Sequence, residues 1–257
     1  MDERRGPADE SAPRGLRPPS PPVRAGIEPR GAGALEEAPG DATLGVVLAG
    51  GLSRRMGELG PKAALSIGGE RLLARVVRRL RAGSLREVLV VGPPELGAQV
   101  PGVPVVADRR PGAHGPLAGL ETALLWASAA TAEHPDTPYR RVFVVACDMP
   151  FVAPALVRAM VARAARTPEA EADALVLRSA TGTEQLHAVY SLVCLPVATA
   201  LLDSGARSLR ELLARLRTVE YPAAEAARDD PSGLSAFNAN TPDDWQRALD
   251  LAAEEGE

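Results

Sequence analysis

The sequence predicts an α/β protein, a three-layer αβα sandwich built around a mostly parallel, Rossmann-like sheet. Two observations predict this fold. Short, uninterrupted apolar runs are typical of strands that are buried on both faces. These runs alternate along the chain with longer segments in which apolar residues recur at helical spacing. Apolar residues make up 46% of the chain, which is enough to fill the core of such a sandwich.

The first strand is expected at 44–49, where the run LGVVLA ends in a Gly-Gly pair. The segment 71–81 follows, with its leucines and valines on one helical stripe. Further strands are expected at 88–91, 103–107, 142–146, 174–177 and 188–192, and further helices at 117–130, 154–166 and 208–216, with a last helix opened by Thr241-Pro242.

Two helix starts carry capping signals. Ser208 precedes Glu211 by three residues, which is the spacing of a capping box. Thr241 supplies a cap hydroxyl, Pro242 occupies the first helical position, and Asp243 and Asp244 place acids in the first turn. These signals locate the N-termini of the last two predicted helices.

The first 42 residues differ from the rest. They contain 8 prolines and 6 glycines and show no periodic apolar pattern. Such a segment cannot bury enough surface to offset its ordering entropy, so residues 1–42 are expected to be a disordered tail and residues 43–257 a single folded domain.

Charge and composition exclude several classes of protein. The net charge of −4 argues against binding to nucleic acid through a broad basic face. No apolar run approaches the roughly 20 residues of a membrane span, and the N-terminus lacks a signal peptide's apolar region. Cys147 and Cys194 have no zinc-type spacing. We therefore expect a cytoplasmic protein that binds neither nucleic acid nor membrane.

A glycine-rich segment follows the first strand. Leu48-Ala49-Gly50-Gly51 leads into Arg54-Arg55-Met56-Gly57, and Lys62, the chain's single lysine, follows. Glycines after a strand let backbone N–H groups approach a phosphate, and fixed cations neutralise its charge. The alternative is a plain Gly-Gly turn beside an arginine-rich loop. The segment matches neither the P-loop nor the G-x-G-x-x-G pattern.

Acidic residues follow two other predicted strands. Asp148 follows VFVVA after one intervening residue, Cys147, and Asp108 comes directly after VPVVA. Mg²⁺ is commonly bound by one or two carboxylates together with substrate phosphates. The alternatives are a helix N-cap for Asp148 and a turn aspartate for Asp108.

Three further side chains are candidate contacts for a second substrate. Asn238 and Asn240 are the chain's only asparagines, and their spacing puts both on one side of an extended segment. They could equally be turn residues before a helix. His187 could be either a ligand contact or a structural histidine. Arg207-Ser208 precedes a predicted helix, where an anion could dock.

Four motifs together resemble a known family. L-A-G-G-x-S-x-R-M-G followed by lysine resembles the signature of the nucleoside-triphosphate transferase superfamily, and its Gly-Gly form is similar to the molybdenum cofactor guanylyltransferases. The segments GPLAG, CDMPF and NANTPDD resemble that family's other motifs, in the same order. The resemblance covers about residues 44–250.

This resemblance implies a reaction and roles for named residues. It implies transfer of GMP from GTP to molybdenum-molybdopterin with release of pyrophosphate, and Mg²⁺ as the cofactor. It assigns Lys62, Arg55 and Asp148 to catalysis, with Asp148 on the metal. The nucleotide would contact Leu48, Ala49, Gly50, Gly51, Lys62, Asp108 and Asp148, and the acceptor would contact His187, Asn238 and Asn240.

The chain departs from the family pattern at one position. The family often has an asparagine after the second strand, where this chain has Gly92. A cytidylyltransferase of the same fold, acting on molybdopterin or a sugar-alcohol phosphate, is therefore the alternative reaction. Molybdoenzymes or their chaperones are further possible partners.

Overall fold

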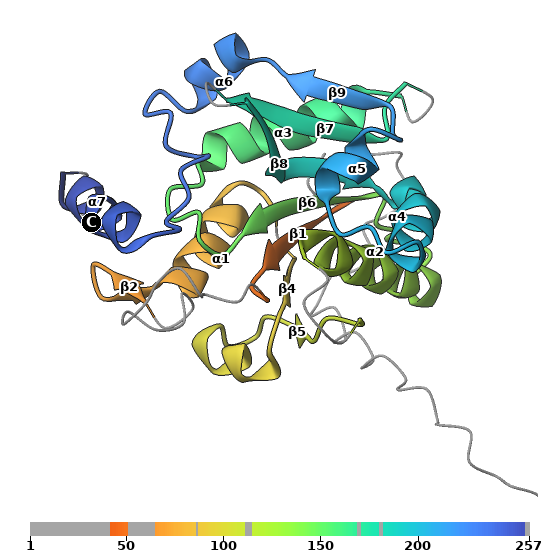
Figure 1. Ribbon diagram of the computed structural model, residues 1–257, viewed down its shortest axis with the longest axis horizontal. Helices are drawn as coiled ribbons and strands as arrows, with labels where there is room; N and C mark the ends of the chain where they lie inside the picture. Colours follow the sequence, from red (N-terminus) through yellow and green to blue (C-terminus); the bar gives the residue numbers. More distant parts are fainter. Residues whose placement is uncertain are drawn as a thin grey trace, which may run out of the picture.

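A seven-stranded sheet with the order β5-β4-β1-β6-β8-β7-β9 forms the centre of the molecule (Figure 1). The computed structural model describes residues 42–50, 65–85, 87–110, 115–168, 171–179 and 182–254. Only β8 runs antiparallel to its neighbours β6 and β7, and the other neighbouring pairs are parallel. The strands are β1 (Thr43–Leu48), β4 (Val88–Val91), β5 (Val105–Val106), β6 (Arg141–Ala146), β7 (Ala174–Ser179), β8 (Gly182–Ser191) and β9 (Thr218–Tyr221).

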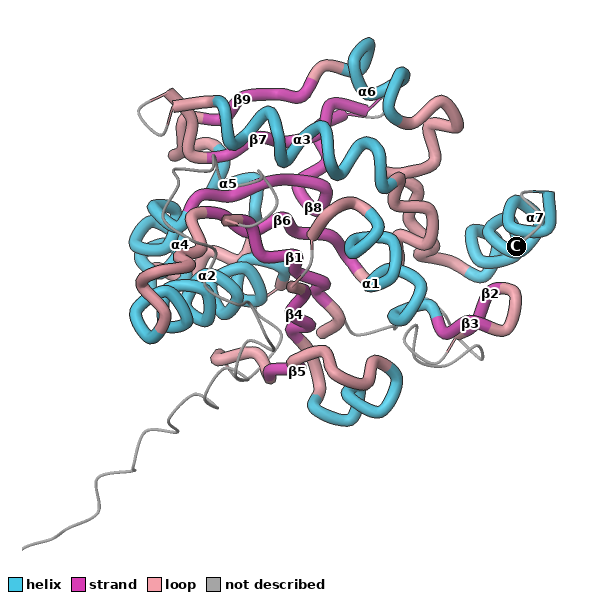
Figure 2. Tube along the Cα trace, turned by 180° about the vertical axis from the view of Figure 1, so that it is seen from behind, coloured by secondary structure: helices cyan, strands magenta, loops and turns pink. Residues whose placement is uncertain are grey.

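Helices cover both faces of this sheet, as the front and back views show (Figures 1 and 2). One face carries α1 (Leu72–Ala82), α3 (Pro154–Arg166) and α6 (Ala223–Asp229), and the other carries α2 (Pro116–Glu133), α4 (Leu195–Asp203) and α5 (Leu209–Leu213). Val46 packs in the cluster under α2, whereas Val47 packs in the cluster under α1 and α3. Continuous apolar strands are thus buried on both faces, and the predicted three-layer sandwich is confirmed.

A small third cluster lies beside this sandwich. The hairpin of β2 (Ser66–Ile67) and β3 (Glu70–Arg71) packs against the C-terminal helix α7 (Pro242–Glu254). Ile67, Phe151 and Trp245 are among its buried members. The C-terminal segment is thereby held next to the turn that follows β6.

The predicted elements agree with the structure best where apolar runs are long. The limits of β4 and α3 are as predicted, but β8 begins at Gly182 rather than Ala188. Its first half, GTEQ, is polar and only half-buried, so no apolar run announces it. Leu192 belongs to the 3₁₀ helix Leu192–Cys194, and a second such helix spans Pro94–Gln99. The elements β2, β3, α4, β9 and α6 were not predicted.

Both capping predictions are confirmed. The Ser208 hydroxyl accepts the Arg210 N–H at 3.1 Å, and the Glu211 carboxylate accepts the Ser208 N–H at 3.3 Å. At α7 the Thr241 hydroxyl accepts the Asp244 N–H at 3.1 Å, and the Asp244 carboxylate accepts the Thr241 N–H at 2.9 Å.

The described residues include Ala42, which the sequence assigned to the tail. Ala42 is buried, and its carbonyl accepts the Arg140 N–H at 2.9 Å. Residues 1–41 lie outside the described residues. Cys147 and Cys194 are both buried, and no disulfide joins them. Among the described residues, no helix has the length and apolar character needed to cross a bilayer.

Candidate functional site

The strands β1 and β6 meet at the point where the chain order of the sheet reverses. From β1 the chain proceeds through α1 to β4 and β5 on one side, and then through α2 to β6 on the other. Ligands of open α/β sheets bind at the carboxyl ends of the strands at such a point. Here the Cys147 N–H donates to the Leu48 carbonyl at 3.0 Å, and the Ala49 N–H donates to the Val91 carbonyl at 2.8 Å.

Leu48, Ala49 and Gly50 lie at this edge, where the sequence predicted a nucleotide. A Cβ atom added to Gly50 would have no neighbouring described atom within 4 Å. Gly51, Arg55 and Lys62, the other members of the predicted phosphate-binding segment, lie outside the described residues.

Asp148 lies in the turn after β6, and its Oδ1 atom is buried. The Ala239 N–H donates to the Asp148 carbonyl at 2.9 Å. Ala239 is itself buried, and the half-buried Asn238 and Asn240 flank it. Residues about 90 positions apart in the chain, which the sequence singled out separately, therefore converge on one turn.

The alternative interpretation of Asp148 as a helix cap is wrong. The helix α3 begins at Pro154, its N-cap residue is Ala153, and no side chain caps it. Asp148 lies too far before this helix to bond its first N–H groups. Asp148 therefore lies at the carboxyl edge of the sheet without capping α3.

Arg75 was not predicted as part of the site, although it supports the Asp148 turn. Its side chain is 2% exposed, and its Nε donates to the Pro150 carbonyl at 2.9 Å. The guanidinium also lies over the Phe151 ring, 5.6 Å from the centroid. An arginine on the apolar stripe of α1 was the available signal, because a buried charge needs partners.

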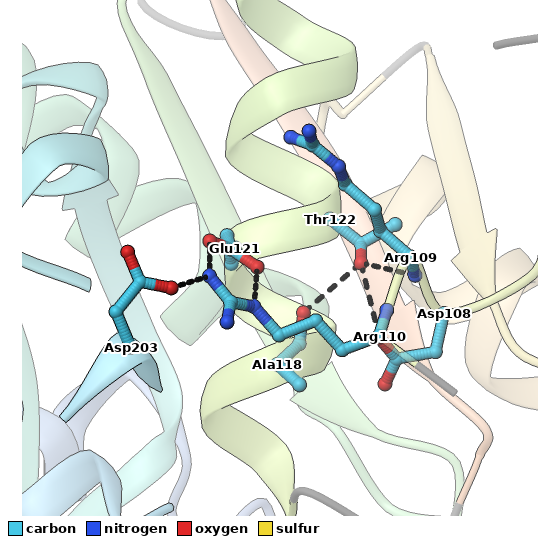
Figure 3. Close-up of polar contacts among 7 residues, drawn as sticks. All are labelled: Asp108, Arg109, Arg110, Ala118, Glu121, Thr122 and Asp203. Carbon is cyan, nitrogen blue, oxygen red and sulfur yellow. Dashed lines mark hydrogen bonds and ion pairs between the residues drawn. The ribbon is translucent and has the colours of Figure 1, made fainter. Parts of the chain in front are cut away.

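Asp108 follows β5 and adopts the turn conformation that the sequence offered as an alternative. Its Oδ1 accepts the Arg110 N–H at 3.1 Å and lies 3.3 Å from the Thr122 hydroxyl. A turn role and a ligand contact are compatible, because a carboxylate has a second oxygen. Figure 3 shows that second oxygen turned away from Thr122. The nucleotide contact stays a prediction.

His187 lies in the core of the sheet. It is fully buried in β8, stacks edge-on against Phe143 and forms a 2.7 Å hydrogen bond with the Ser235 hydroxyl through Nε2. Burial lowers its pKa to about 4, so the ring is neutral near pH 7. A ring in this position is structural, and the acceptor contact expected of it finds no support.

Two glycines of the GPLAG segment allow close packing. Gly115 has φ = 72°, and a Cβ there would come within 2.9 Å of the Arg207 carbonyl oxygen. A Cβ on Gly119 would lie 3.1 Å from Leu48 Cδ2. Only glycine lets the start of α2 approach both Arg207 and the end of β1 this closely.

A cleft of about 530 Å³ opens beside the start of α2. Pro116, Gln185, Arg207 and Ser208 are among the residues that line it. Gln185 lies in the polar half of β8 that sequence periodicity did not reveal. The cleft therefore combines one cation, Arg207, and one carboxylate, Glu211, with amide and hydroxyl groups, and Arg207 is the group in this polar lining that can bind an anion.

Comparison with known proteins identifies the family. The model of the MobA-like NTP transferase domain matches residues 45–219. The chain belongs to the MobA-like NTP transferase family. It is 37% identical over 212 residues to a probable molybdenum cofactor guanylyltransferase of Opitutus terrae, covering 80% of this chain and 94% of that one. A molybdenum cofactor guanylyltransferase of Mesorhizobium japonicum is 35% identical over 213 residues, covering 80% and 94%.

A solved structure extends this likeness. Molybdopterin-guanine dinucleotide biosynthesis protein A from Archaeoglobus fulgidus superposes with a TM-score of 0.65 at 26% identity, covering 82% of this chain and 99% of that one. The predicted membership of a nucleotidyltransferase family is confirmed. As a MobA-like NTP transferase, the chain is a nucleotidyltransferase.

Proposed function

We propose that this transferase moves GMP from GTP to the terminal phosphate of molybdenum-molybdopterin, with pyrophosphate as the leaving group. The product is the guanine dinucleotide form of the cofactor. One observation carries the proposal: Asp148 stands at the reversal point of the sheet and is joined through its carbonyl to the Asn238–Asn240 segment. The guanylyl choice is supported by the names of relatives that are 33–37% identical to this chain.

The acceptor phosphate is already an anion and needs little deprotonation. The protein must therefore align two phosphates that repel each other and neutralise their charge. We assign this work to Lys62 and Arg55, on the motif that contains them, and close backbone approach to Gly50 and Gly51. Leu48, Ala49 and Asp108 complete the nucleotide pocket.

The donor set fits a magnesium ion that arrives with the nucleotide. Among residues 42–50, 65–85, 87–110, 115–168, 171–179 and 182–254, no three His, Cys, Asp or Glu side chains form a metal cluster. A single carboxylate suits Mg²⁺, which takes one or two carboxylates and substrate phosphates. Asp148 would hold it, and the bound ion would neutralise phosphate charge.

We place the acceptor between the Asn238–Asn240 segment and the cleft beside α2. The cleft offers Arg207 and Gln185, which can bind a phosphate and a polar ring system. Asn238 donates its own amide to the Ala236 carbonyl at 2.8 Å, which orients its side chain. We therefore assign the acceptor contact that the sequence also suggested for His187 to the cleft and the Asn238–Asn240 segment.

Nucleotide choice is the direct test. Thermal stabilisation by GTP, CTP and ATP, each with and without Mg²⁺, should be largest for GTP with Mg²⁺. Guanine should be preferred by about 2–3 kcal/mol in binding, because a wrong base leaves buried polar groups unpaired. Equal turnover of CTP and GTP at subsaturating concentration would reject the guanylyl assignment and leave the nucleotidyltransferase assignment standing, whereas faster turnover of CTP would favour the cytidylyltransferase alternative.

A further inference from the structure

Asp108 lies beyond the last hydrogen bond that the sheet makes to this part of the chain. The strand β5 is two residues long and lies at the edge of the sheet, where β4 is its only partner in the described part of the chain. The last sheet hydrogen bond near it runs from the Gly92 N–H to the Val106 carbonyl, at 2.8 Å. A short edge strand constrains the chain weakly, so the direction of the Asp108 side chain needs another source.

The helix α2 supplies part of that support. The Thr122 hydroxyl accepts the Arg109 N–H at 3.0 Å and lies 3.0 Å from the Ala118 carbonyl. The same hydroxyl lies 3.3 Å from Asp108 Oδ1, which also accepts the Arg110 N–H at 3.1 Å. The Arg110 N–H therefore orients the Asp108 carboxylate, and the neighbouring Arg109 N–H is bonded to Thr122 of α2 (Figure 3).

The Arg110 side chain anchors this backbone. Its Nε and Nη2 donate to the two oxygens of Glu121 at 2.7 and 2.8 Å, a bidentate pair. Nη2 also lies 2.8 Å from Asp203 Oδ1 at the end of α4. A two-point contact fixes the orientation of a guanidinium as well as its distance. Arg110 is thus held by α2 and α4 together.

Burying the charged side chain of Glu121 on the inner face of α2 costs desolvation free energy. Its side chain is 1% exposed, whereas that of Asp203 is 63% exposed. Burial opposes ionisation of Glu121, but hydrogen bonds from Arg110 and Thr199 outweigh it, and its pKa lies below the usual range. A buried ion pair is weak support for stability, since apolar residues of similar size often do as well. A positional role explains its presence better.

We propose that Arg110 and Glu121 are positioning residues which hold the Asp108 carboxylate toward the nucleotide. This inference rests on the proposed function, because it takes Asp108 as a nucleotide contact. The link is direct: the residue whose side chain is anchored on Glu121 is also the residue whose N–H orients Asp108.

Glu121→Gln is the first test. It keeps the size of the side chain but removes the charge that holds Arg110. The amide hydrogens of Arg109 and Arg110 should exchange faster with solvent. The Kd for GTP with Mg²⁺ should rise about tenfold, while kcat at saturating GTP stays within about twofold, as expected for loss of a binding contact. Unchanged amide exchange with unchanged Kd would overturn the proposal.

Two further variants separate position from stability. Arg110→Met/Glu121→Met replaces the ion pair with apolar side chains, which should keep the melting temperature near wild type. Its Kd for GTP should nevertheless rise as in Glu121→Gln. Val161→Ala is the matched control, because Val161 is buried in α3 on the other face of the sheet. It should lower the melting temperature and leave the Kd unchanged. A wild-type Kd in the double methionine variant would refute positioning.

A double-mutant cycle with Asp108 closes the test. If Glu121 acts through Asp108, Glu121→Gln should add nothing to the Kd of an Asp108→Ala protein. Additive effects, or a wild-type Kd for Asp108→Ala alone, would overturn the proposal. If the enzyme binds CTP in preference to GTP, the cycle is measured with CTP. Rejection of the guanylyl assignment therefore leaves this result interpretable.

Discussion

Replacing Arg75 with glutamine should destabilise the protein and loosen the turn that carries Asp148. The substitution removes the donor of the 2.9 Å hydrogen bond to the Pro150 carbonyl and the cation over the Phe151 ring. A hydrogen bond from a charged group contributes about 1.5–3 kcal/mol, and a desolvated cation–π contact about 1–2 kcal/mol. Recovered hydration of the arginine offsets part of this, so we expect a net loss of about 3 kcal/mol.

The melting temperature converts this loss into a measurement. For a domain of this size, 1 kcal/mol corresponds to about 2–4 °C, so Arg75→Gln should melt about 6–12 °C lower. Pro150 lies two residues after Asp148, so the looser turn should also raise the Mg²⁺ concentration needed for half-maximal activity. Both quantities are measured on the same protein, at a temperature where the variant is folded.

Arg78→Gln provides the matched control. Arg78 lies on the same helix and contacts Glu70 at 2.9 Å, but its side chain is 53% exposed. An exposed ion pair contributes about 0–1 kcal/mol, so this variant should melt within about 4 °C of wild type. Equal melting temperatures for the two variants would refute the assignment of Arg75 as the support of the turn.

Three other substitutions test the site and its surroundings. Lys62→Arg should reduce the rate about as strongly as Lys62→Ala, on the order of 10²- to 10³-fold, because a wide fork replaces a compact ammonium; full activity in steady-state assays would show that only diffuse charge matters. Asp148→Asn should raise the Mg²⁺ requirement with little change in melting temperature, since its carbonyl and not its carboxylate bonds Ala239; unchanged activity at limiting Mg²⁺ would place the metal elsewhere. His187, whose pKa burial lowers to about 4, stays neutral in the folded state while the unfolded chain takes up a proton below about pH 6.5. The contribution of His187 to the free energy of unfolding is therefore fully present above that pH and falls toward pH 4. Between pH 7 and pH 5, the free energy of unfolding in urea should fall by about 2 kcal/mol more in wild type than in His187→Gln. Equal losses would contradict a buried neutral ring.

The layered fold and the edge of the sheet at which the site is predicted could both be inferred from the amino-acid pattern alone. Runs such as VFVVA are apolar at every position, so they can only be buried on both faces, and their ends locate Asp148 and Asp108. The caps at Ser208 and Thr241 were equally readable, because capping depends on residues within one helical turn.

The long-range partners of these residues became visible only in the packed fold. Two examples are the contact of Ala239 with Asp148 and the pairing of Arg110 with Glu121, which join segments that are far apart or lie on different elements. The burial of His187 is a third example, because it depends on the order of the strands and the packing around them. Local periodicity carries no information about such distances. Polar strand halves like GTEQ stay hidden for the same reason: their place in the sheet comes from neighbours and not from their own apolar pattern.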